Sequence, residues 1–179
     1  MSVVALWSPS DLVLSILAPL AVAASRPPCL VVDLDPNGPR FSAGPTLAEL
    51  VADGPTADQL APKRSGVSVL GNGGVRAGDA EDVVAALGRR WPSLVLRCPP
   101  TEPAPPAAIA LIPLLPGPLA LRTDPHRTIL QRVGLRVDVP DGIPVVREPR
   151  PSTLRALASM RMPVRSRWVR QLGQIWSPT

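Results

Sequence analysis

Prolines and glycines divide the sequence into short apolar runs, and this division limits the folds that the chain can adopt. Runs of this kind occupy residues 3–7, 29–33, 67–70, 94–96 and 109–115. Each run is shorter than an ordinary helix and is rich in Val, Leu and Ile, which is typical of strands buried on both faces of a parallel sheet. The 25 prolines stand mostly between the runs, where they end elements.

Helical segments are predicted between the apolar runs, at residues 11–24, 46–53 and 79–90. In the first of them Ser10 is the expected N-cap, and Pro19 is expected to kink or shorten the helix. Strands that alternate with helices indicate a parallel sheet with crossover connections. The predicted fold class is therefore α/β, with a mostly parallel sheet flanked by helices.

The pattern is weaker after residue 116. We expect a helix at residues 125–133 and a strand at residues 135–139. Two further helices are expected near the C-terminus. The first spans residues 152–160 with Ser152 as its cap, and the second spans residues 165–176.

Positive charge is concentrated near the C-terminus. The whole chain has a formal net charge of +5, but residues 1–146 sum to −1, and residues 147–179 hold seven arginines and one glutamate. A basic segment of this kind indicates an anionic partner, either a lipid headgroup, a nucleic acid or an acidic protein. We therefore expect an α/β domain at residues 1–150 and a basic helical tail at residues 151–179.

The last predicted helix is amphipathic. At about 100° per residue, its apolar side chains share one face, namely Trp168, Val169, Leu172, Ile175 and Trp176. Arg167 and Arg170 fall mostly on the other face, and Arg165 lies at the boundary. Three interpretations stay open: a helix in the membrane interface with Trp at headgroup level, a helix packed on the domain or on a protein partner, and a nucleic-acid contact.

Other signals for chemistry or export are weak. Cys29 and Cys98 each flank a predicted strand and are interpreted as buried thiols, not as a disulfide. The single histidine, His126, lacks a ligand cluster at metal-binding spacing, so no metal is expected. Residues 12–24 resemble the apolar part of a secretory signal, but no Lys or Arg precedes them and Asp11 stands at their start. A cytoplasmic location is the expectation.

Three segments in order resemble the ParA/MinD family of P-loop ATPases over roughly residues 1–115. The first is the strand, loop and apolar helix at residues 3–24, and the second is residues 30–38, which contain the Asp-x-Asp-Pro pattern. The third, residues 91–100, resembles a later family strand that ends before Pro-Pro. Residues 46–50 also stand where the family has a Thr-Leu helix. The resemblance implies a P-loop NTPase-like fold.

The departures from this family concern the residues that bind Mg-ATP. The family's first loop is rich in Gly and carries lysines that bind phosphates, whereas this chain has Ser8, Pro9, Ser10 and Asp11. Arg97 stands where the family has the acidic residue that supports Mg²⁺, and a guanidinium cannot bind a cation. The glycines and Asn72 of residues 71–74 predict a turn and not a second phosphate loop. We expect no ATP hydrolysis, no catalytic residues and no cofactor or metal.

Four residues are candidates for a ligand site at the strand ends: Ser10, Asp33, Asp35 and Arg97. One interpretation is that Asp33 and Asp35 cap a loop and pair with basic neighbours. A more specific hypothesis is that Asp33 forms a salt bridge with Arg97 across adjacent strand ends, so that replacing Arg97 by Ala destabilises the protein. The alternative is an altered site in which Arg97 holds an anion such as phosphate or carboxylate.

The resemblance implies a non-catalytic ParA/MinD-like scaffold or positioning protein in bacterial cell division, chromosome segregation or surface-appendage assembly. Its partner would be a protein such as an active ATPase homologue, in a homo- or heterodimer. If the tail (Arg165, Arg167, Trp168, Arg170, Leu172, Ile175 and Trp176) binds anionic lipid, the protein would lie at the inner face of the membrane. The alternative function is an anion or nucleotide binder, or an enzyme, with an altered site around Arg97.

Overall fold

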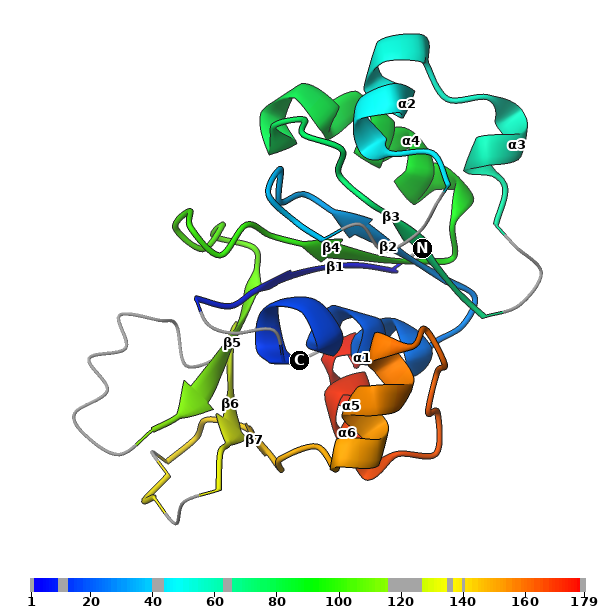
Figure 1. The fold of residues 1–179 in the computed structure, drawn as a ribbon. Helices are drawn as coiled ribbons and strands as arrows, with labels where there is room; N and C mark the ends of the chain where they lie inside the picture. The colour runs from blue at the N-terminus through cyan, green and yellow to red at the C-terminus, as the bar shows by residue number, and fades with distance from the viewer. Residues whose placement is uncertain are drawn as a thin grey trace.

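In the computed structural model, a parallel β-sheet forms the centre of the molecule (Figure 1). The structure describes residues 2–9, 13–39, 44–62, 66–115, 127–134, 137–139 and 141–177. Within these ranges the sheet has seven strands in the order β3-β2-β4-β1-β5-β6-β7, and each neighbouring pair is parallel. The strands are β1 (Ser2–Trp7), β2 (Cys29–Asp33), β3 (Val67–Leu70), β4 (Ser93–Arg97), β5 (Ile109–Leu114), β6 (Thr128–Arg132) and β7 (Val145–Val146). The predicted α/β fold class is confirmed, and the layout is compatible with a P-loop NTPase-like fold.

Helices cover both faces of the sheet. Figure 1 shows α2, α3 and α4 on one face and α1, α5 and α6 on the other. The helical elements are the π-helix η1 (Val13–Leu17), α1 (Ala18–Ala24), α2 (Leu47–Asp53), α3 (Ala57–Leu60), the 3₁₀-helix η2 (Ala77–Ala80), α4 (Glu81–Arg90), α5 (Pro151–Ala158), α6 (Arg167–Leu172) and the 3₁₀-helix η4 (Gly173–Trp176). Each face has its own apolar core, because the buried strands present apolar side chains to both sides.

The helix predicted at residues 11–24 is divided into η1 and α1, and residues 10–12 lie outside the described residues. Pro19 occupies the first turn of α1, where its missing N–H and fixed φ are tolerated. The turn before it is widened into a π-helix. The expectation that Pro19 shortens the α-helix is therefore confirmed.

Three predictions for the C-terminal third are wrong. Residues 128–132, predicted as helix, form strand β6, because Thr128 and Ile129 fit a strand between β5 and β7. Residues 137–139, predicted as strand, form no regular element, and the strand that follows is the two-residue β7. The N-cap of α5 is Arg150, so Ser152 lies inside the helix. Pro151 sets this boundary because proline favours the first helical position.

The C-terminal helices share the core of the domain. Leu157 of α5 and three residues of α6, Trp168, Val169 and Leu172, are buried in the same cluster as the alanines of α1. The Trp168 Nε1–H donates to Gln131 Oε1 at 3.0 Å. Of the three interpretations of the amphipathic helix, the structure shows packing on the domain. Among the described residues, no helix has both the length and the apolar character needed to cross a membrane.

Candidate functional site

The candidate site lies where β2 and β4 end. These strands are neighbours in register, so Asp33 is directly opposite Arg97. Both are the last residues of their strands, and Asp35 follows two residues after β2. Ligands of open α/β sheets bind outside the carboxyl ends of the strands, so this edge is where the fold would place a binding site.

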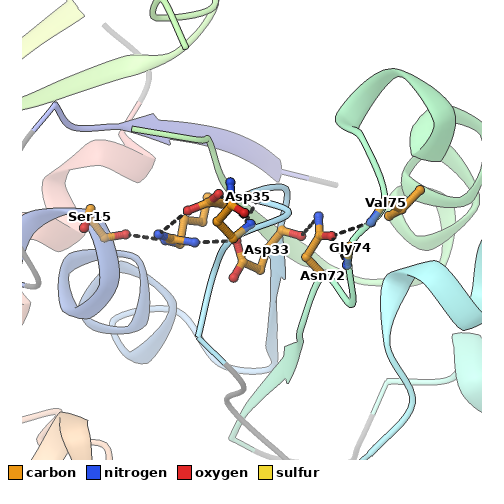
Figure 2. Close-up of polar contacts among 8 residues, drawn as sticks. Ser15, Asp33, Asp35, Asn72, Gly74 and Val75 are labelled. Atoms are coloured by element: carbon orange, nitrogen blue, oxygen red, sulfur yellow. Dashed lines mark hydrogen bonds and ion pairs between the residues drawn. The ribbon is translucent and has the colours of Figure 1, made fainter. Parts of the chain in front are cut away.

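The guanidinium of Arg97 contacts three oxygen atoms (Figure 2). Its Nη1 lies 2.6 Å from Asp33 Oδ1, and its Nη2 lies 3.0 Å from Asp35 Oδ2. Its Nε–H donates to the carbonyl oxygen of Ser15 at 2.7 Å. The Arg97 side chain is only 4% exposed, so water screens these contacts little. The predicted Asp33–Arg97 salt bridge is confirmed, and Asp35 joins it.

The contact with Ser15 joins Arg97 to the helical segment that leads into Pro19. In a regular α-helix, the carbonyl of Ser15 would accept from the N–H of residue 19. Pro19 has no N–H, so this bond is not available. Arg97 donates to this carbonyl, and the buried cation is thereby joined to the first helical segment as well as to β2.

The loop after β2 closes over the ion pair. Asp33 Oδ1 accepts from the backbone N–H of Asp35 at 2.9 Å, and Asp35 Oδ1 accepts from that of Asn37 at 3.0 Å. Gly38 then donates its N–H to the carbonyl of Asp35. A Cβ on Gly38 would lie 2.7 Å from Arg97 Nη1 and would also collide with the Asp33 carboxylate. Only a residue without a side chain permits this approach.

Asn72 connects β3 to the same loop. Its Nδ2 donates to the carbonyl of Asp33 at 3.2 Å, and its Oδ1 accepts from the N–H groups of Gly74 and Val75, both at 2.8 Å (Figure 2). Asn72 is buried, and Gly74 has a positive φ. The predicted turn at residues 71–74 is confirmed, and its role here is to position the end of β2.

The electrostatics of the cluster leave no free positive charge. One guanidinium faces two carboxylates, and each of its three nitrogens already donates to a protein oxygen. Burial raises the pKa of Asp33, against the opposing effects of Arg97 and of the Asp35 amide. The second oxygen of Asp33, Oδ2, is buried without a hydrogen-bond partner in the described part of the chain. The carboxylates therefore outnumber their cation, which disfavours a phosphate ligand.

A pocket of about 740 Å³ lies beside the cluster. Gly38, Asn72 and the N-cap residue of α2, Thr46, are among its lining residues. Its charged lining residues are Glu49 and Asp53, and no Lys or Arg of the described chain lines it. A nucleotide phosphate would meet negative charge here, in contrast to the cationic cradle that phosphate binding needs.

The predicted site residues separate into two groups. Asp33, Asp35 and Arg97 lie together, whereas Ser10 lies outside the described residues. The exposed arginines of the C-terminal segment lie in the helical layer with α5 and α6, so they do not join the strand ends. In the described ranges no cluster of His, Cys, Asp and Glu could hold a metal ion. Cys29 and Cys98 are buried thiols, as predicted.

Sequence reasoning missed three members of the site: Ser15, Gly38 and Asn72. Ser15 takes part through its backbone carbonyl, so its side chain gives no indication of this role in the sequence. Gly38 lies in the segment that resembles the family, but no motif marks it as a position of close approach. Neither a scan against models of protein families nor a search of curated proteins found a match to this chain.

Proposed function

We propose that this protein is a non-catalytic member of the ParA/MinD-type fold group that acts as a scaffold or positioning protein by binding a protein partner. The observation that carries the proposal is the closed Arg97–Asp33–Asp35 cluster at the strand ends. In an active P-loop ATPase this region must receive a nucleotide and its metal. Here side chains of the protein itself fill it.

The charge around this edge also argues against catalysis. Mg-ATP needs backbone amides and a Lys for its phosphates and an acidic residue to support Mg²⁺. Arg97 stands where the resemblance places the acidic residue, and it forms ion pairs with Asp33 and Asp35. The described residues that line the adjoining pocket add only acidic charges. The altered-site alternative is not favoured, because the donors of Arg97 that would hold an anion already contact protein oxygens.

The proposed partner is a protein, with an active ATPase homologue as the first candidate. Insertion of the apolar face of the C-terminal helix into lipid is disfavoured because Trp168, Val169 and Leu172 would have to leave the core. Trp176 is also held, since its Nε1–H donates to the carbonyl of Val22 at 3.1 Å. The apolar anchors that an interfacial helix inserts into lipid are therefore already used within the domain.

A thermal-stability panel with ATP, ADP and GTP, each with and without Mg²⁺, tests the proposal. A ligand at about 100 times its dissociation constant adds about 2.7 kcal/mol to the free energy of unfolding, so a bound nucleotide would be visible. We expect unchanged melting temperatures and no phosphate release. ATP turnover that Asp35→Asn abolishes, while Asp79→Asn on the exposed surface leaves it intact, would show that the protein is an ATPase.

A further inference from the structure

Five exposed arginines line one pocket on the opposite side of the sheet from the acidic pocket. This arginine pocket consists of Arg147 and Arg150 before α5, Arg165 before α6, and Arg167 and Arg170 of α6, around a volume of about 750 Å³. No carboxylate of the described chain lies within ion-pair distance of these five guanidinium groups. Five cations thus face a shared space without an ion-pair partner among the described residues.

The single acidic residue of the arginine pocket does not balance this charge. Glu148 lines the pocket, but its Oε2 accepts the backbone N–H of Gly134 at 3.1 Å and is directed to that loop. Counting Glu148, the lining still has a net charge of +4. Like charges gathered in this way repel one another, and an anion bound among them would remove the repulsion.

The frame of the pocket is fixed by contacts that leave the guanidinium groups free. The hydroxyls of Thr153 and Ser166 lie 3.0 Å apart and join α5 to the segment before α6. The side-chain oxygen of Gln171 accepts the backbone N–H of Arg147 at 3.3 Å, and Trp168 anchors α6 in the core. The arginines are therefore carried by ordered backbone that core packing and these hydrogen bonds hold in place.

We propose that the arginine pocket binds a phosphate-bearing ligand. Guanidinium groups bind phosphate oxygens through paired, charge-assisted hydrogen bonds, and a group with several charges can engage several arginines at once. The volume falls within the range of about 300–1,000 Å³ that is usual for small-ligand pockets. The ligand is either a free phosphorylated molecule or a lipid headgroup, since both offer the same chemistry. This site is separate from the Arg97 cluster and does not depend on the proposed scaffold role.

Calorimetric titration of the full chain with sodium tripolyphosphate tests the proposal. The variant Arg167→Gln/Arg170→Gln removes two charges from the pocket, and Arg89→Gln/Arg90→Gln removes two exposed charges at the end of α4 as the matched control. We expect the pocket variant to bind about tenfold more weakly or worse, a change of about 1.4 kcal/mol or more. The control should stay within about twofold of wild type. Because all four side chains are exposed, both variants should fold.

A second experiment distinguishes a free phosphorylated ligand from a lipid headgroup. Co-sedimentation compares vesicles of phosphatidylcholine alone with vesicles that also contain phosphatidic acid. Binding of tripolyphosphate without vesicle binding indicates a free ligand, and vesicle binding that only the pocket variant loses indicates a headgroup. The proposal is overturned if neither probe binds, or if both variants lose binding equally. It is also overturned if only a poly-glutamate peptide or an oligonucleotide binds.

Discussion

Replacing Arg97 by methionine tests the central claim about the strand ends. Methionine keeps much of the apolar stem but removes the cation, so Asp33 and Asp35 would remain buried without a counter-charge. Removing one partner of a buried ion pair costs about 3–5 kcal/mol. For a domain of this length, each kcal/mol changes the melting temperature by about 2–4 °C, so we expect a decrease of about 6–20 °C.

The loss should depend on pH in a defined direction. The pKa of Asp33 is raised above its ordinary value of 3.8, so the folded state holds more protons than the unfolded state between 3.8 and the folded pKa. The free energy of unfolding therefore falls as pH rises through this interval. Removing Arg97 raises the folded pKa of Asp33 further and widens the interval, because the cation that favours the ionised carboxylate is lost. The variant should be closest to wild type near pH 4 and furthest from it near neutral pH.

Urea denaturation of wild type and Arg97→Met at several pH values measures both effects. Arg76→Met is the control, because Arg76 forms an exposed ion pair with Asp79 at 3.2 Å and exposed pairs contribute little. Adding Asp33→Asn to Arg97→Met should restore part of the lost stability. An unchanged midpoint for Arg97→Met, or an equal loss at all pH values, would refute the account of the cluster.

Three further results are expected. Gly38→Ala should destabilise the fold, as measured by urea unfolding, because the new Cβ would collide with the Asp33 carboxylate and lie 2.7 Å from Arg97 Nη1; an unchanged urea midpoint would contradict this. Burial raises the pKa of Cys29 to about 12 and that of Cys98 to about 11. Both thiols should therefore resist a disulfide reagent at mildly alkaline pH until the protein unfolds. Rapid labelling of either thiol in the folded protein would contradict this. Leu172→Ala should lower the free energy of unfolding by about 2–5 kcal/mol, because Leu172 is buried. Val164→Ala should lower it far less, because Val164 is 52% exposed. Thermal unfolding of the two variants compares these losses.

The sequence predicted the first five strands because their apolar runs are bounded by strong breaks. Residues 29–33 and 67–70 match β2 and β3 at both ends. The prediction failed at β6, where Thr128–Arg132 has no alternation and few breaks, so only its pairing with β5 and β7 decides its structure. It also missed β7, because a two-residue strand has no periodicity to detect.

The candidate site could be predicted only where side chains carry the contacts. Asp33 and Arg97 were paired from their positions at adjacent strand ends, and the structure bears this out. The second contact, with Asp35, needs the loop geometry that Gly38 permits, which no spacing rule gives. For the amphipathic C-terminal helix, the side chains were predicted but their contacts were not. Its apolar face was evident in the sequence, but periodicity does not say which surface that face covers.

The bond between Arg97 and the carbonyl of Ser15 has a consequence for how this sequence can evolve. An N–H restored at position 19 would place a second donor near this carbonyl oxygen, and an Arg97 substitution would remove the guanidinium donor. A change at either position therefore alters the selection on the other. In homologous sequences, proline at position 19 and arginine at position 97 should be inherited together and lost together, although 77 residues lie between them in the chain.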